Sequence, residues 1–353
     1  MANAKQLPSG SWRVRVFAGK NANGKPQYKS FTASTERKAN LVALEWQEKY
    51  KEISSDSSNL TVEEAIDAYI ELKDNILSPS TIRFLDAVKR NHLQGIKSTK
   101  LAHLTRNIIQ EAINAEAAGK SPKTVKNVYG VLSSVIGQYR PDWVMPKIAL
   151  PQQQKPQEKA LNAKQIAILL NNIDGDPIEI PILLALWLGL RRSEILALKW
   201  ADVDFDKMTI RIESALVPNK NSQMVEKSTK TTESTRTLKL PIYIAEKLKT
   251  YPHDGDRIFN ISEGLPSKHF PRLCKNIGIG RFKFHDLRRS MATIGMSLNI
   301  ADKLIMVRGG WNNPQTMKNI YQVVLDSDLN EADILINNYF EKLLPNVDKE
   351  KPI

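Results

Sequence analysis

A run of closely spaced prolines is the feature that most limits how this chain can fold. The prolines stand at Pro141, Pro146, Pro151 and Pro156, and a polar glutamine run occupies residues 152–154. Proline fixes its φ angle and has no amide hydrogen to donate, so such a segment cannot sustain a helix. This composition is typical of an extended connector between domains. The sequence therefore predicts separately packed parts joined by a linker over residues 141–159.

The composition is that of a globular protein with an excess of positive charge. A chain of 353 residues suffices for two or three domains, and a hydrophobic share of 41% is ordinary. The formal net charge of +13 favours a polyanionic partner, because lysine and arginine release counterions when they neutralise phosphates. Nucleic acid is therefore the first candidate partner, and an anionic membrane is the second.

Several other classes of protein are disfavoured. The longest apolar run, residues 181–190, is about half the roughly 20 residues that a membrane-spanning helix requires. The N-terminus lacks the apolar core of a signal peptide, so we expect a cytoplasmic, nucleoid-associated protein without a membrane partner. Cys274 is the only cysteine, and the five histidines lack the spacing of a metal site. We therefore expect no internal disulfide, no metal and no cofactor.

The N-terminal residues form a small basic unit over 1–53. Apolar and basic residues alternate over 12–17, a turn-prone segment follows, and a second strand-like run covers 27–31. This pattern predicts a hairpin, and a helix is expected over 35–50. The first 50 residues carry nine Lys or Arg against three Asp or Glu. That excess suits either docking on DNA or an ordinary solvated sheet face.

A helical domain is predicted over residues 59–140. Residues 54–58 are expected to be a polar linker with nothing to bury. The domain's four helix starts each pair a capping side chain with a helix-compatible first turn, at Thr61, Ser78, Thr105 and Ser121. Its basic residues, among them Arg83 and Lys123, either track a DNA backbone or only keep the bundle soluble.

Beyond the linker the pattern becomes mixed. Asn162 and Gln165 have the spacing of a capping box. Helices are expected over 163–172 and 178–188, followed by a strand at 208–213, a polar hairpin and further helices. A mixed α/β domain follows from this order, and it contains the residues best suited to chemistry.

Four short motifs in this domain carry those residues. They are GLRRSE at 189–194, KTTESTR at 230–236, HDLRRS at 285–290 and GWNNPQTMKNIY at 310–321. The guanidinium fork of Arg191 matches two phosphate oxygens, and His285 and Arg288 stand three residues apart on one helix face. Lys230 falls at an expected hairpin tip, and Tyr321 ends a short amphipathic segment. Each alone has an ordinary interpretation, as a snorkelling arginine, a surface pair, a solvated lysine or a packed tyrosine.

In this order the four motifs resemble the tyrosine recombinases, and most closely the phage integrase branch. The resemblance implies a multidomain, mainly α fold with α+β parts. These parts are a small N-terminal β-sheet plus helix unit, a four-helix core-binding domain and a mixed α/β catalytic domain. The implied boundaries are an arm-type DNA-binding domain at 1–53, a core-site DNA-binding domain at 59–140, a linker at 141–159, a catalytic domain with a C-terminal helix at 160–345 and a tail at 346–353.

The resemblance also implies a reaction. Arg191 and Arg288 would clamp the scissile phosphate, and His285 would help to activate or hydrogen-bond the nucleophile or the phosphate. Lys230 would protonate the departing 5′ oxygen, and Tyr321 would attack the phosphate to leave a 3′-phosphotyrosyl bond. An integrase of this kind cleaves and rejoins DNA strands at attachment sites without ATP or a metal ion.

Three residues depart from the family pattern. Trp311 completes the catalytic set at a position that is often histidine, and its indole can donate a hydrogen bond and pack but cannot shuttle protons. Arg289 stands where another histidine is common, and Gly309 stands where leucine usually precedes the glycine. Glu194 is expected to orient Arg191 rather than act as a base. These departures concern local packing and the identity of the base, and they leave the reaction class unchanged.

The implied partners are double-stranded DNA attachment sites of core and arm type, bound by a homotetramer, with room for a DNA-bending host protein and an excisionase. Residues 329–344 are expected to form an amphipathic helix that docks either on a neighbouring protomer or in cis. The residues assigned to DNA contact are Trp12, Arg13, Arg15 and Lys29 in the arm-type domain and Arg83 and Lys123 in the core-site domain.

Two rival functions remain open. A type IB-like topoisomerase shares this chemistry but relaxes supercoils as a monomer, and the three-part layout and short length of the chain argue against it. A catalytically silent DNA-binding regulator would need none of the motifs, and the complete set of candidate residues argues against that function.

Overall fold

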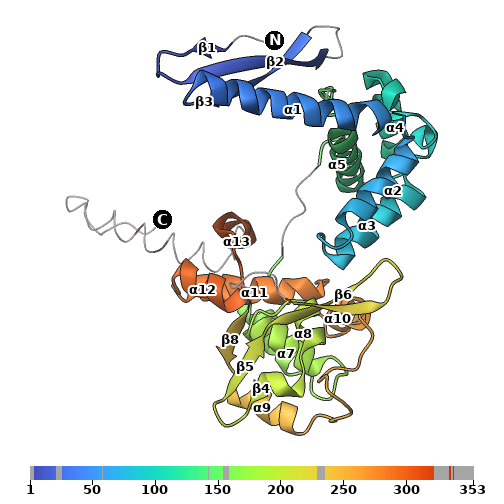
Figure 1. Cartoon of the computed structure of the whole chain (residues 1–353). Coiled ribbons are helices and arrows are strands. Elements are labelled where there is room, and N and C mark those ends of the chain that lie inside the picture. The colour runs from blue at the N-terminus through green and yellow to red at the C-terminus, as the bar shows by residue number, and fades with distance from the viewer. Residues whose placement is uncertain are drawn as a thin grey trace, which may run out of the picture. The chain divides into compact units, whose positions relative to one another are not determined.

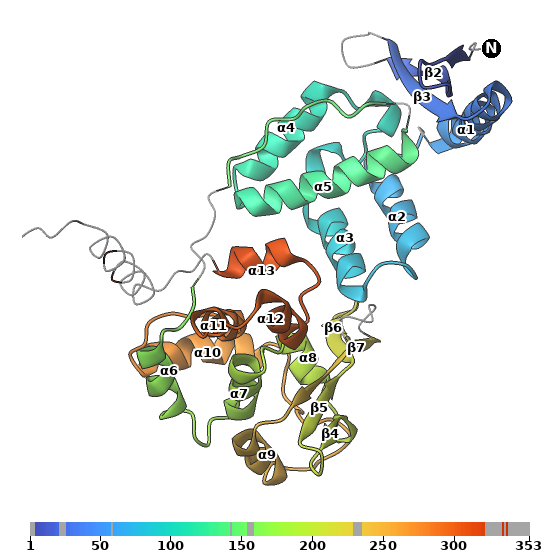
Figure 2. The same cartoon turned by 90° about the vertical axis from the view of Figure 1, so that its left-hand side faces the viewer.

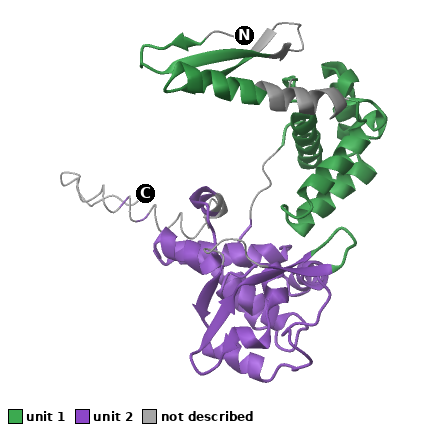
Figure 3. Ribbon diagram, in the orientation of Figure 1, with its two compact units in different colours: residues 1–155, 218–223 green, residues 156–217, 224–353 purple. Residues whose placement is uncertain are grey.

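The computed structural model describes residues 4–20, 26–57, 59–141, 143–153, 159–228 and 235–321, together with Ile334 and Asn337. The chain divides into two compact units, one of residues 1–155 with 218–223 and one of residues 156–217 with 224–353 (Figure 3). The division after Lys155 falls inside the proline-rich stretch. None of the described helices has the length and apolar character that crossing a bilayer requires.

The N-terminal part of the first unit is a three-stranded antiparallel sheet with one helix against it (Figure 1). Its elements are β1 (Lys5–Gln6), β2 (Trp12–Lys20), β3 (Pro26–Ala33) and α1 (Glu36–Ser57). The alternating pattern turns Val14 and Val16 onto Ala39 and Ala43 of α1, and all four are buried. Because strand side chains point to opposite faces in turn, alternate residues of β2 face the helix. The antiparallel pairing of β2 with β3 confirms the predicted hairpin.

Helix α1 is longer than the sequence predicted. The expected linker at 54–58 is wrong for residues 54–57, which continue the helix. The segment contains neither glycine nor proline, and a serine lowers helix stability by only a few tenths of a kcal/mol, so nothing local ends the helix there.

The helical part of the first unit begins its helices where the caps predict. Thr61 and Glu64 form a capping box, and the side chains of Ser78, Thr105 and Ser121 each accept from a backbone amide of the first turn. This part has its own apolar core of valine, isoleucine and leucine, although both parts belong to one compact unit. The helices are α2 (Val62–Lys73), α3 (Pro79–Asn91), α4 (Arg106–Ala117) and α5 (Pro122–Tyr139), with short 3-10 turns at Gln94–Ile96 and Leu101–His103.

The second unit is mixed, and one apolar helix lies at its centre. Helix α7 is buried from Glu179 to Leu186 and packs against α11 (Figure 2), as expected of a helix that is hydrophobic on all sides. The helices are α6 (Ala163–Leu170), α7 (Glu179–Trp187), α8 (Arg192–Ala197), α9 (Ile242–Lys249), α10 (Leu265–Asn276), α11 (Phe284–Ser297), α12 (Asp302–Gly309) and α13 (Pro314–Tyr321), with a 3-10 turn at Trp200–Asp202.

The strands of this unit differ in pairing from the prediction. Residues 230–241, with Lys230 at the tip, were expected to form the tip and the return strand of a hairpin. The structure instead pairs β8 (Arg236–Lys239) with β5 (Thr209–Ile212), next to β4 (Val203–Asp204). The hairpin that does form joins β6 (Ser214–Pro218) to β7 (Met224–Ser228). Leu238 is buried opposite Ile210, so core packing decides which strand β8 pairs with.

Candidate active site

The first candidate arginine follows a sharp glycine turn. Helix α7 ends at Trp187, and Gly189 then adopts a left-handed backbone with φ 70°. A side chain at Gly189 would be strained in that conformation, and its Cβ would lie 2.1 Å from Cε of Met291. Glycine therefore permits the turn that delivers Arg191 to the start of α8, where its side chain stays 36% exposed.

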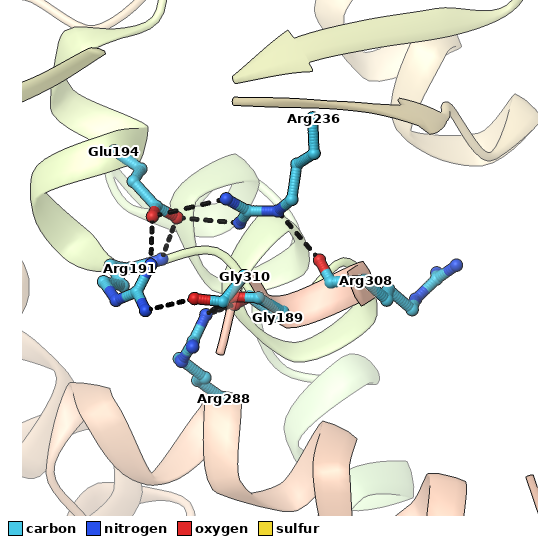
Figure 4. A network of polar contacts seen from close by, with 8 residues as sticks. Gly189, Arg191, Glu194, Arg236, Arg288, Arg308 and Gly310 are labelled. Carbon is cyan, nitrogen blue, oxygen red and sulfur yellow. Dashed lines mark hydrogen bonds and ion pairs between the residues drawn. The ribbon is translucent and has the colours of Figure 1, made fainter. Parts of the chain in front are cut away.

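A buried carboxylate holds this arginine. The side chain of Glu194 is only 2% exposed, and it accepts from the backbone N of Arg191 at 2.9 Å and from Nη1 of Arg191 at 2.5 Å. Arg236 donates to the same carboxylate through Nη2 at 2.9 Å and Nη1 at 3.4 Å (Figure 4). Burial alone would raise the pKa of Glu194, but the charges and hydrogen bonds of both arginines outweigh it and lower the pKa. The carboxylate is therefore ionised and shared between two guanidinium groups.

Backbone carbonyls of the turn before α13 accept hydrogen bonds from both of these arginines. Nε of Arg236 donates to the carbonyl of Arg308 at 2.9 Å, and Nη2 of Arg191 donates to the carbonyl of Gly310 at 2.6 Å. Gly310 has a left-handed backbone with φ 65° and ends α12. The network thus ties the start of α8 and the start of β8 to the turn over residues 308–310 (Figure 4).

Arg288 is the most enclosed charge of the site. The residue is 1% exposed, and its Nη1 donates to the carbonyls of Gly189 and Gly309. Its Cζ lies 3.8 Å from the ring centroid of Trp311, a cation–π contact that also shields it from water. Burial, and then the positive charge of Arg191, lower the pKa of Arg288. Among the described residues, nothing pairs with its Nε and Nη2, so two donors remain available to an anion.

His285 stands at the rim of this arrangement. It lies on the first turn of α11 with its side chain open to solvent on one side. The protein packed on its other side, and then the charges of Arg289 and Arg288, lower the pKa of His285 to about 4. The imidazole is therefore neutral at pH 7 and can take part in hydrogen bonds. A cleft of about 530 Å³ beside it is also lined by Arg191 and Lys283.

Two predicted residues are less fully described. Tyr321 is the last residue of α13, and its side chain lies outside the described part of the structure. Helix α13 itself is anchored, since Met317 is buried against Met291 of α11 and Trp311. Lys230 lies outside the described residues, between the end of β7 and the start of β8 at Arg236.

Comparison with known proteins identifies this arrangement. Residues 159–327, which contain every catalytic candidate, match the phage integrase family. This chain is a tyrosine recombinase of the integrase type. It is similar to a XerC-like tyrosine recombinase of Caldanaerobacter subterraneus subsp. tengcongensis, with 23% identity over 385 residues that cover 93% of this chain and 96% of that protein.

Solved structures share the recombinase fold. The integrase of the transposon Tn1549, in complex with transposon right end DNA, has a TM-score of 0.64 at 17% identity and covers 77% of this chain and 98% of that one. A lambda integrase tetramer bound to a Holliday junction has a TM-score of 0.54 at 17% identity and covers 90% of this chain and 94% of that one. The multidomain α+β architecture of this recombinase is therefore shared with integrases of known structure.

The structure brings four predicted catalytic residues of the recombinase together. Arg191 and Arg288 bond to neighbouring carbonyls of the turn before α13, Trp311 packs on Arg288, and His285 lies one helical turn before it. Among the described residues, no group of three His, Cys, Asp or Glu has the arrangement of a metal site.

The predicted DNA contacts belong to the first unit. Arg13, Arg15, Lys29 and Lys123 are exposed, whereas Trp12 and Arg83 are half-buried. Within the N-terminal sheet, Arg15 lies over the ring of Tyr28 at 5.0 Å, and Lys29 lies 5.2 Å from the ring of Trp46. These contacts hold basic side chains on the sheet surface.

Sequence reasoning overlooked Arg236 as a site residue. The sequence does contain a usable signal, because Arg236, Leu238 and Leu240 alternate with the polar residues Thr237 and Lys239. The structure shows that the three alternating residues are buried. A strand pattern that places an arginine in register with two core leucines indicates a buried charge with a buried partner. That partner is Glu194, which also pairs with Arg191, as the motif predicts.

The pair Gly309 and Trp311 explains one departure from the family pattern and gives a first prediction. A Cβ at residue 309 would lie 2.0 Å from Cζ3 of Trp311, so the indole occupies the space of a side chain at 309. Gly309→Ala should therefore push the indole off Arg288 and destabilise the second unit by about 1–3 kcal/mol, as overpacking does. Thermal unfolding measures the change.

A double-mutant cycle controls this prediction. The steric conflict disappears when Trp311→Ala is added, so Gly309→Ala should cost little in that background. Gly137→Ala in α5 is the matched control, because a Cβ there has no atom within 4 Å. A loss of stability from Gly309→Ala that persists unchanged without the indole would contradict the assigned clash.

Proposed function

We propose that this recombinase cleaves and rejoins DNA strands at attachment sites through a covalent bond between Tyr321 and a 3′ phosphate, as a phage or mobile-element integrase. One observation carries the proposal: Arg191 and Arg288 both reach the turn that leads into the helix ending at Tyr321, and Arg288 keeps two unpaired donors there. Guanidinium donors in an enclosed site stabilise the extra negative charge of a pentacoordinate phosphate more strongly than they could in water.

The chemistry follows from the proposed roles. The Tyr321 hydroxyl attacks phosphorus, the bond from phosphorus to the 5′ oxygen breaks, and a tyrosyl ester with a free 5′ hydroxyl remains. A phenol with a pKa of about 10 is less than about 1% ionised at pH 7, so the reaction requires a proton acceptor. We assign the acceptor role, or a hydrogen bond to the phosphate, to His285, which is neutral at pH 7 and, with a pKa of about 4, a weak base. We assign the protonation of the 5′ oxygen to Lys230. Attack by another strand's 5′ hydroxyl reverses the step without ATP.

We propose DNA-binding roles for the two parts of the first unit. The N-terminal sheet and its helix, over 1–53, would bind arm-type sites with Trp12, Arg13, Arg15 and Lys29, and the excess of basic over acidic residues there supports this. The helical part, over 59–140, would bind core sites with Arg83 and Lys123. Two DNA contacts on one chain raise each other's effective concentration, provided that the linker over 141–159 spans the sites.

We propose that the recombinase acts as a homotetramer on DNA in the bacterial cytoplasm, at the nucleoid, with a DNA-bending host protein and an excisionase as candidate partners. An apolar groove supports the assembly: a cavity of about 520 Å³ between α6, α7, α11 and α12 is lined by exposed Leu298, Leu304 and Trp187. The predicted amphipathic helix at 329–344 of a neighbouring protomer has the apolar face to fill it. Of that segment, the structure describes only Ile334 and Asn337.

A supercoiled plasmid with two copies of a DNA site selected by the protein from random sequences tests the function. Exchange of the segments flanking the sites is expected at fixed salt concentration, with none on a plasmid that lacks the sites. Relaxation without rearrangement, independent of the paired sites, would instead indicate a type IB-like topoisomerase. Tight binding with neither outcome would indicate a silent regulator.

A further inference from the structure

Arg236 occupies a junction between three segments of the candidate active site. Arg236 is the first residue of β8, directly after the segment that contains Lys230, and its side chain is 4% exposed. One edge of its guanidinium bonds to Glu194, at the start of α8, and its Nε bonds to the carbonyl of Arg308. The proposed chemistry assigns no step to Arg236, although Arg236, like Arg191, bonds to both Glu194 and the 308–310 turn.

The contacts of Glu194 show what depends on Arg236. Glu194 fixes Arg191 twice, through its backbone N and through Nη1. A carboxylate buried to this degree stays ionised only when cations compensate for its lost hydration. Arg191 is 36% exposed and directed to the site, whereas Arg236 is enclosed. Arg236 is therefore the enclosed counter-ion that keeps Glu194 charged and in place as a holder for Arg191.

The turn before α13 depends on the same side chain. A Cβ built on Gly310 would lie 2.8 Å from Nη1 of Arg236, which shows how closely the guanidinium approaches the backbone there. The Gly310 carbonyl in turn accepts from Nη2 of Arg191. Arg236 and Arg191 thus brace two consecutive parts of the turn, at residues 308 and 310, and α13 begins four residues later with Pro314.

We propose that Arg236 is a positioning residue for strand cleavage, which sets the distance between Arg191 and the helix that ends at Tyr321. The inference rests on the proposed function and deepens it. A planar guanidinium can bond to Glu194 along one edge and to the Arg308 carbonyl through Nε at the same time. The ammonium group of a lysine is a single compact donor centre, so it can bond well to only one of these two partners. The bridge, and not the charge alone, is what arginine supplies here.

Three variants separate bridge from charge. Arg236→Lys keeps the charge and loses the bridge, and Arg236→Met loses both. Arg211→Lys is the matched control, because Arg211 lies on the neighbouring strand β5 with a side chain that is 60% exposed. For each variant, thermal unfolding, the Kd for the selected site and the single-turnover cleavage rate at saturating DNA are measured on a nicked duplex that traps the covalent product.

We expect Arg236→Lys to bind DNA within about threefold of wild type and to cleave about 10–100 times more slowly, because misplacement by about 1 Å can cost 10²-fold in rate. Arg236→Met should be slower still, and Arg211→Lys should match wild type. Cleavage by Arg236→Lys at the wild-type rate would overturn the proposal, and so would a defect confined to Kd or to stability.

A spectroscopic readout keeps this test separate from the proposed function. In protein with labelled arginine, the two Nη groups of wild-type Arg191 should give distinct nuclear magnetic resonance signals, because Glu194 and Gly310 hold them differently. Arg236→Lys should merge these signals as the side chain begins to rotate. Absence of covalent product in wild type would refute the proposed cleavage. Unchanged Arg191 signals in Arg236→Lys would refute positioning, whatever the activity.

Discussion

Replacing Arg288 by lysine should slow covalent cleavage of DNA by about 10²–10³-fold, the usual cost of removing one preorganised donor from a charge-stabilising site. Nη1 of Arg288 bonds to the carbonyls of Gly189 and Gly309, and a lysine ammonium can replace that donor. Nε and Nη2 have no partner among the described residues, and lysine has nothing in their place. The substitution should therefore spare the fold and remove the donors that we assign to the phosphate.

The measurement is the single-turnover cleavage rate at saturating DNA, with the Kd determined in parallel at the same salt concentration. Because Arg288 is buried, it contributes little to steering DNA, and the Kd should stay within about threefold of wild type. Arg211→Lys serves as the control substitution on an exposed arginine. An Arg288→Lys variant that cleaves as fast as wild type would remove Arg288 from the proposed catalytic set.

Replacing Glu194 by glutamine should destabilise the second unit by about 3–5 kcal/mol, because it leaves two guanidinium groups at a buried site without their counter-charge. Thermal unfolding should show a fall in Tm of roughly 10 °C. The exposed carboxylate Glu226, which pairs with Lys199, offers a matched control. Glu226→Gln should change stability by less than about 1 kcal/mol, since solvent screens exposed ion pairs.

The difference in stability between wild type and Glu194→Gln should depend on pH. The pKa of Glu194 is lower in the folded protein than its ordinary value of 4.5, so its contribution to stability is complete above pH 4.5 and disappears as the pH falls through the folded pKa. The stability gap between wild type and Glu194→Gln should therefore be largest near pH 7 and shrink in acid. A gap that stays constant from pH 7 to acid would show that the charge of Glu194 does not hold the two arginines.

The sequence predicts those parts of the fold that depend on local signals. Helix starts at Thr61, Ser78, Thr105 and Ser121 were correct because a cap and its amide lie within one turn. The burial of Val14 and Val16 followed from strand alternation for the same reason. The end of α1 was wrong because polar composition by itself does not end a helix that lacks glycine and proline.

The site required contacts that local patterns do not contain. Arg191 and Arg288 were predicted from motifs, but the shared carboxylate joins Glu194 to Arg236 across separate elements, and only the fold reveals it. The pairing of β8 with β5 is likewise a long-range choice made by core packing. Gly309 and Trp311 are a further example, because the clash that requires glycine appears only when the indole lies on Arg288.

The central claim is that Tyr321 forms a covalent bond with DNA, and a nicked suicide substrate tests it most directly. The short strand released by cleavage diffuses away from such a duplex, so the covalent product accumulates and can be seen on a denaturing gel. Wild type should give a protein–DNA adduct whose modified peptide contains Tyr321, and Tyr321→Phe should bind the same DNA equally well and give no adduct. An adduct of undiminished yield in Tyr321→Phe would contradict the account, because another residue would then be the nucleophile.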